Sequence, residues 1–114
     1  PHKDTKFKNE NHGDVSLVLM LLSIIRLLKP NILLPATTAL GTVDPLGREK
    51  GILHGANVVM PNLSPVKHRK DYSLYDNKIC TGDEVAQCIG CLADRMKKIG
   101  FEIVTDRGDY KADI

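Results

Sequence analysis

The pattern of hydrophobic and polar positions begins with a long apolar run over residues 15–28, in which 11 of the 14 residues are apolar. Asp14 precedes this run as a helix-capping residue, and Pro30, which cannot continue a helix, follows it, so a helix is predicted between them. The run is shorter than the roughly 18 to 20 residues that cross a bilayer, which favours a buried helix over a transmembrane one. Because apolar side chains surround nearly the whole helix, we expect neighbours to cover it on more than one side.

Two shorter apolar segments, residues 31–38 and 57–60, have the pattern of parallel strands that are buried on both faces, since their apolar residues are continuous rather than alternating. Helices are predicted from Pro45 to about His54, with Gly55 ending the helix, and again over residues 64–72. The order helix, strand, helix, strand, helix with short connections is the signature of βαβ units on a parallel sheet, so an α/β fold is expected.

The last third of the chain has a different pattern. Residues 75–78 are rich in turn formers, a helix is predicted from about Glu84 to Ile99 with Gly100 after it, and residues 101–105 are a candidate final strand. We therefore expect about two strands and three to four helices.

Composition and charge exclude several functional classes. The 16 Lys and Arg residues nearly balance the 14 Asp and Glu residues, giving a net charge of +2, and tryptophan is absent. Neither a nucleic-acid surface nor a membrane surface is indicated. The basic run over residues 67–70 could bind phosphate, but such a run on a short helix is usually its solvated face.

The residues at the start of the chain and after its apolar run indicate where in the cell the protein is found and whether the chain is part of a longer protein. No small-residue cleavage site follows the run, because Lys29 and Pro30 come next, so a secretory signal is not indicated and a cytoplasmic protein is expected. The sequence begins at Pro1 and its length of 114 residues is well short of the roughly 250 residues of a complete (β/α)8 barrel. We expect a piece excised from a longer protein.

Three clustered cysteines form the sharpest chemical motif, Cys80-x7-Cys88-x2-Cys91. Cys88 and Cys91 lie three positions apart on a predicted helix, and Cys80 precedes it in a loop that can fold back. Three thiolates can hold three irons of a four-iron cluster, or can bind zinc together with His54 or His68. The alternative is that Cys88 is a small core residue and the other two are incidental.

A second candidate site lies where the two predicted strands end. Thr37 and Thr38 close the first strand, and Met60 closes the second, at the edge where barrel and doubly wound enzymes place ligand contacts. Tyr72 and Tyr75 could reach back over the same pocket. The alternatives are ordinary helix capping by the threonines, core packing by Met60 and a surface position for the tyrosines.

The segments 35–42, 44–45 and 55–62 (PATTALGT, DP and GANVVMPN) resemble the C-terminal part of the HydE family of FeFe-hydrogenase maturases. That family lies in the biotin synthase and thiamine-synthesis branch of the radical SAM enzymes. The resemblance extends from about Pro1 to Tyr110, and the spacing of the three cysteines also matches the family's accessory cluster motif. Biotin synthase itself is a weaker match, because the cysteine trio is absent from its pattern.

The resemblance implies the last quarter of a (β/α)8 barrel, the biotin and thiamin synthesis associated region, with residues 1–114 as one unit and residues 76–100 as a cysteine-bearing accessory segment. It implies that Thr37 and Thr38 face the substrate cavity, and it makes three more residues pocket candidates: Met60, Tyr72 and Tyr75. It also implies that the cysteine trio can hold a second iron–sulfur cluster, a metal site formed by Cys80, Cys88 and Cys91. That cluster varies among members and is not the catalytic one.

One departure from the family limits what this chain can do. The radical SAM motif C-x3-C-x2-C is absent from the 114 residues. We therefore expect the catalytic iron–sulfur cluster and S-adenosylmethionine to be bound by the parent enzyme and this chain to have no catalytic residue of its own. The expected partners are the N-terminal barrel portion of the parent, a small or iron-bound precursor, and further copies of the chain through unpaired strand edges. A biotin synthase-like domain and a freestanding, non-catalytic metal or iron–sulfur module remain the alternatives.

Overall fold

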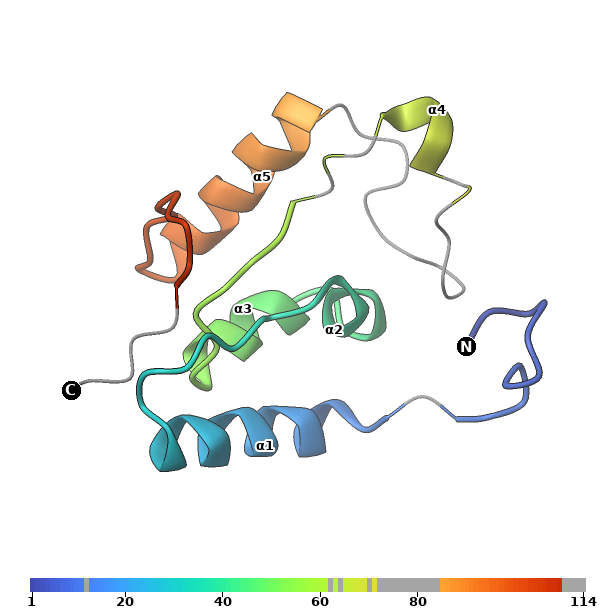
Figure 1. The fold of residues 1–114 in the computed structure, drawn as a ribbon, viewed down its shortest axis with the longest axis horizontal. Helices are drawn as coiled ribbons and strands as arrows, with labels where there is room; N and C mark the ends of the chain where they lie inside the picture. Colours follow the sequence, from blue (N-terminus) through green and yellow to red (C-terminus); the bar gives the residue numbers. More distant parts are fainter. Residues whose placement is uncertain (12, 62, 64, 70, 72–84, 110–114) are drawn as a thin grey trace.

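The computed structural model describes residues 1–11, 13–61, 63, 65–69, 71 and 85–109. Its helices are α1 (Val15–Leu28), α2 (Thr38–Val43), α3 (Gly47–Leu53), α4 (Val66–Arg69) and α5 (Val85–Lys98). Figure 1 shows α1 on one side of the α2–α3 pair and α5 on the other. Of the described residues, no helix has both the length and the apolar character to span a membrane.

Helix α1 begins and ends as the sequence predicts. The Asp14 side chain accepts a hydrogen bond from the backbone N–H of Ser16 at 2.9 Å, which caps the first turn. No residue of α1 is fully buried, and its most exposed apolar side chains are Leu27 and Leu28, at 81% and 73%. The described residues therefore cover this apolar helix only in part, whereas the sequence predicts cover on more than one side.

The two predicted strands lie side by side and parallel, but the described residues join them by a single bridge between Pro35 and Val58. Ala36 donates to the Val58 carbonyl at 2.9 Å, and Val58 donates to the Leu34 carbonyl at 3.1 Å. Pro35 has no N–H to donate, and the chain turns into α2 immediately afterwards, so the ladder ends there. The prediction of full strands over 31–38 and 57–60 is therefore wrong in length, although the parallel pairing is present.

Helix α2 replaces a predicted strand end and turn. Thr37 caps it, because its hydroxyl oxygen accepts a hydrogen bond from the Leu40 N–H at 3.2 Å, and Thr38 is already its first residue. Helix α3 then begins two residues later than the predicted start at Pro45. It ends at Leu53, with Gly55 at φ 110° as the turn residue, as predicted.

Helix α5 agrees with the helix predicted from about Glu84 to Ile99, and Gly100 follows it at φ 86°. The candidate strand over residues 101–105 is wrong, since the backbone there has no regular structure. A strand needs a partner for its backbone groups, and none of the described segments pairs with this one. The start of the predicted helix at residue 64 lies outside the described residues, and the part that is described forms α4.

The hydrophobic core joins three elements of the chain around the parallel bridge. The buried side chains of the bridged segments and α3 meet those of α5, and the set consists of Leu34, Ala36, Ile52, Ala56, Leu92 and Met96. These residues are aliphatic or methionine, as a chain with so few aromatic residues requires. Their packing fixes α5 against α3 and so positions the side chains of the candidate site.

Candidate functional site

Three of the residues predicted to line a substrate cavity, Thr37, Thr38 and Met60, follow the bridged segments. Because the pairing of Pro35 with Val58 is parallel, Thr37 and Met60 both follow the bridge in the same direction. Met60 is 55% exposed, which does not fit the alternative that it fills the core. Tyr72 and Tyr75 lie outside the described residues.

The two threonines have different surroundings. The Thr37 hydroxyl is occupied as the cap of α2, as the capping alternative predicts. Thr38 is half-buried in the first turn of α2, and its carbonyl oxygen accepts a hydrogen bond from the Thr42 hydroxyl at 2.9 Å.

The predicted cysteine site is described at one of its three side chains. Cys91 is a free, exposed thiol on α5, and Cys88 belongs to the same helix three positions earlier. Cys80 lies outside the described residues. Within the part of the chain that the structure describes, no three His, Cys, Asp or Glu side chains are close enough together to hold a metal ion.

The two histidines considered as a fourth zinc ligand have other contacts. The His54 ring nitrogen Nδ1 lies 2.7 Å from the Lys50 carbonyl oxygen, at the end of α3. His68 lies on α4, where its Nδ1 is 3.7 Å from a carboxylate oxygen of Asp71. Neither histidine is placed near Cys91 by a described contact.

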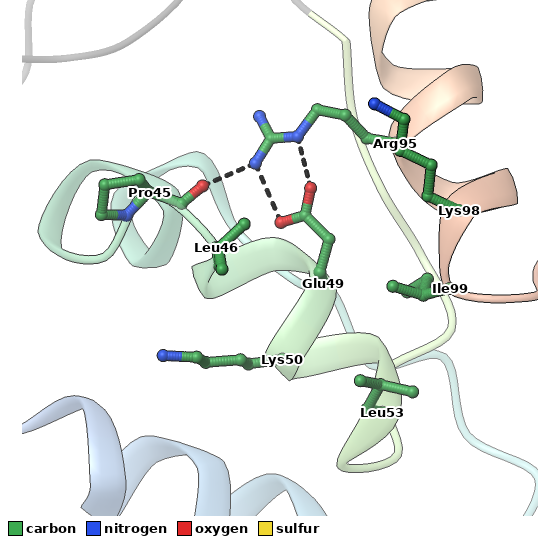
Figure 2. Close-up of a pocket in the computed structure, with 8 residues that line it drawn as sticks. All are labelled: Pro45, Leu46, Glu49, Lys50, Leu53, Arg95, Lys98 and Ile99. Atoms are coloured by element: carbon green, nitrogen blue, oxygen red, sulfur yellow. Dashed lines mark hydrogen bonds and ion pairs between the residues drawn. The ribbon is translucent and has the colours of Figure 1, made fainter.

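A third site, which the sequence does not single out, is an open pocket of about 520 Å³ between α3 and α5. Figure 2 shows the guanidinium of Arg95, from α5, lying against the carboxylate of Glu49, from α3. Arg95 donates from Nε and Nη2 to both carboxylate oxygens, the second at 2.8 Å, and Nη2 also donates to the Pro45 carbonyl at 2.6 Å. The apolar side chains of Leu46, Leu53 and Ile99 line the rest of the pocket with Lys50 and Lys98.

The ion pair keeps Glu49 ionised despite its burial. Only 9% of the Glu49 side chain is exposed, and 27% of that of Arg95. Burial alone raises the pKa of Glu49, but the hydrogen bonds from Arg95 and the positive charges of Arg95 and Arg48 outweigh it, so the pKa lies below the usual 4.5. Both carboxylate oxygens of Glu49 accept hydrogen bonds from Arg95, so this side chain links α3 to α5 and is a poor candidate for a general base.

A second ion pair supports the start of α3. Asp44 accepts hydrogen bonds from Lys50 Nζ at 2.5 Å and from the Leu46 N–H at 2.9 Å. The Lys50 hydrogen bond, followed by the Leu46 one, holds the pKa of Asp44 below its usual 3.8. Asp44 therefore ends α2 and ties the first turn of α3 to it.

Comparison with known proteins gives one informative match, and no protein-family model matches the chain. The chain is 41% identical over 111 residues, 97% of its length, to the [FeFe] hydrogenase maturase subunit HydE of Thermotoga maritima. It resembles part of a hydrogenase maturase. The aligned region is 32% of HydE, so the chain spans about a third of the length of this relative.

The match to HydE confirms the resemblance predicted from the segments around Thr37 and Asn57. It extends across nearly the whole chain, including both bridged segments, α3 and α5.

Proposed function

We propose that this chain is the C-terminal, substrate-cavity and accessory-cluster region of a HydE-like radical SAM enzyme that acts in FeFe-hydrogenase maturation. The observation that carries the proposal is the 41% identity to HydE over 97% of the chain. Identity at this level, held over more than a hundred residues, accompanies a shared fold. The 32% coverage of the relative is what a region of a larger enzyme would give.

In this proposal the two bridged segments belong to the last part of a (β/α)8 barrel. Their parallel pairing, with helices α2 and α3 between them, supports this placement. Barrel enzymes build their sites from the residues that follow each strand, which here include Thr38 and Met60. Tyr72 and Tyr75 are assigned to the cavity on the basis of the resemblance alone.

The work of this chain is to shape and close the cavity. In the parent, the four-iron cluster and S-adenosylmethionine supply a 5′-deoxyadenosyl radical when bound, and the C-x3-C-x2-C motif for that cluster is absent here. The Thr38 hydroxyl and the Met60 thioether are the described groups that would orient a small or iron-bound precursor and exclude water from it. The chain alone should release no 5′-deoxyadenosine after anaerobic reconstitution with iron and sulfide, and its detection would overturn this part of the proposal.

The accessory cluster is assigned to α5 and the segment before it. The exposed thiol of Cys91 and the position of Cys88 on the same helix suit a cluster near the surface. The place of Cys80 as the third ligand rests on the resemblance. A protein that uses free thiols in this way belongs in the reducing cytoplasm, which is where we place the parent.

A chimera tests the proposal directly. The matching third of Thermotoga maritima HydE is replaced by this chain, and hydrogenase activity is measured after maturation with the chimera. We expect activity well above that of HydE lacking this third. A Thr38→Val chimera should lose most of it, while a Thr42→Val chimera serves as the matched control on the same helix. A chimera that folds and binds S-adenosylmethionine, yet gives no maturation, would contradict the proposed role.

A second candidate is a freestanding, non-catalytic metal or iron–sulfur module, favoured by the exposed Cys91 thiol. A biotin synthase-like domain is a weaker alternative because the cysteine trio is not part of that pattern. Metal analysis separates zinc from iron, and the chimera separates a maturase region from the other two. Maturation by the chimera would exclude a module that acts only by itself.

A further inference from the structure

Arg48 is the most deeply buried charged residue among the described residues, and two of its side-chain nitrogen atoms have no hydrogen-bond partner. It lies in the first turn of α3 and is 3% exposed. Its Nε and Nη1 atoms are buried, and no residue in the described ranges accepts a hydrogen bond from either. Buried polar groups in folded proteins nearly always have a hydrogen-bond partner, so we expect an acceptor for the Nε and Nη1 groups of Arg48.

Among the described residues, the acidic side chains closest to Arg48 in the sequence have other partners. The adjacent carboxylate, Glu49, gives both of its oxygens to Arg95. Asp44, the other acid near the start of α3, is paired with Lys50. No described residue forms an ion pair with Arg48, so its buried positive charge has no direct counter-charge among the described residues. A water molecule could accept a hydrogen bond there, but it would not neutralise this charge.

Helical register places Arg48 beside the end of the first bridged segment. Positions 48, 51 and 52 lie on one side of α3, because residues three and four apart are neighbours on a helix. A Cβ atom at Gly51 would lie 3.1 Å from the Cβ atom of Ala36, the residue before the α2 cap. Ile52 belongs to the core. Arg48 thus lies on the side of α3 that packs against the segment ending at Ala36.

We propose that Arg48 binds a small oxyanion, a phosphate or a carboxylate group, at the end of the bridged segment that leads into α2. An oxyanion supplies hydrogen-bond acceptors for Nε and Nη1, which have none among the described residues, and it places a negative charge beside the guanidinium. The inference goes beyond hydrogenase maturation and does not depend on it. It assigns to Arg48 a ligand chemistry that neither the cysteine trio nor the threonines provide.

Thermal unfolding of the 114-residue chain in phosphate, acetate and chloride at equal ionic strength tests the assignment. We expect phosphate or acetate to raise the midpoint by about 5 °C at roughly ten times its dissociation constant, and chloride to have no such effect. If acetate as well as phosphate raises the unfolding midpoint, the site accepts carboxylate groups in addition to phosphate. A rise with phosphate alone identifies phosphoryl groups.

Two variants separate a built site from general charge effects. Arg48→Met should remove the rise and should fold at least as stably as the original chain in chloride, because it removes two buried donors that have no hydrogen-bond partner. Arg107→Met, a change at an arginine that is 85% exposed, should keep the full rise. Should Arg48→Met fail to fold, the original chain still decides the question by calorimetric titration with phosphate. No oxyanion-specific rise or binding in the original chain, or a full rise in a folded Arg48→Met chain, would overturn the proposal.

Discussion

Arg26 and Gly55 lie so close together that no side chain fits between them. Arg26 donates from Nε to the Gly55 carbonyl at 2.8 Å, across 29 residues, and a Cβ atom at Gly55 would lie 2.8 Å from the Arg26 Cβ. Ser23 adds a hydrogen bond to the His54 carbonyl at 3.1 Å. The side chains of Arg26 and Ser23 therefore hold α1 to the carbonyl groups of His54 and Gly55, which follow the last residue of α3. A positive charge is favourable at this end of a helix.

Gly55→Ala should destabilise the chain by about 2–4 kcal/mol, because alanine at φ 110° is strained and its methyl group collides with Arg26. The measurement is chemical denaturation followed by circular dichroism. Gly100→Ala is the matched control, since it also has a positive φ but meets no atom within 4 Å. It should cost only about 1–2 kcal/mol. Equal losses in the two variants would refute the close approach to Arg26.

Arg95→Met should cost about 1–3 kcal/mol, because it leaves the largely buried Glu49 carboxylate without its two charge-assisted hydrogen bonds. Lys97→Met, at an exposed position on the same helix, should cost little. A double-mutant cycle with Glu49→Gln measures the coupling between the two side chains. A coupling energy near zero would mean that the pair does not hold α5 to α3.

The same pair predicts how stability depends on pH. The folded-state pKa of Glu49 lies below its usual 4.5, so its stabilising effect is complete above about pH 4.5 and disappears as the pH falls through the folded value. Asp44 acts in the same direction below its usual pKa of 3.8. Denaturation curves between pH 7 and pH 3 should show stability falling on acidification. Glu49→Gln should fall less steeply, and a variant with the unchanged slope would contradict the assignment.

A paired Cys88→Ser, Cys91→Ser variant should lose the metal or cluster that the reconstituted chain binds, because thiolates supply the ligands. Iron, sulfide and zinc analysis after anaerobic reconstitution measures the loss. Lys97→Ala, six positions after Cys91 on α5, should bind as much metal as the original chain. Unchanged metal content in the cysteine variant would favour the alternative of an ordinary core cysteine.

The partly covered α1 should make the chain self-associate at high concentration. Leu27 and Leu28 are the most exposed of its apolar side chains, and a second copy would bury them. Light scattering after size-exclusion chromatography should show a shift toward monomer for Leu27→Lys. Val104→Lys, at a residue that is 77% exposed outside the helices, is the control. A monomeric original chain at high concentration would rule out this association.

The features that the sequence predicts well have local signals. Asp14 marks the start of α1, and Gly55 and Gly100 mark where α3 and α5 end, because capping and positive φ depend on a few neighbouring residues. Helix α2 is missed because six residues, TALGTV, are too few to display a helical period. The threonine before it does give a capping signal, and the structure confirms that Thr37 is the cap.

The features that the sequence does not predict depend on distant partners. The strand segments shorten to one bridge because their pairing depends on residues 23 positions apart and ends where Thr37 starts a helix. The pairing of Glu49 with Arg95 spans 46 residues, and no spacing rule connects them. Arg48 and Glu49 are visible in the sequence as charges within a helix between two apolar segments, but their burial follows only from the packing of α2, α3 and α5.

The sequence separation of these contacts also sets an order of assembly. The Pro35–Val58 bridge encloses α2 and α3 in one short stretch of chain, whereas Leu92 and Met96 reach the core only by closing a much longer loop. Because loop closure costs more entropy as loops lengthen, we expect the bridged unit to form early and α5 to dock afterwards. Amide hydrogens of α5 should then exchange sooner than those of α3. The helix that carries Cys88 and Cys91 would thus dock after the bridged unit has folded, and it would detach by local unfolding before that unit opens.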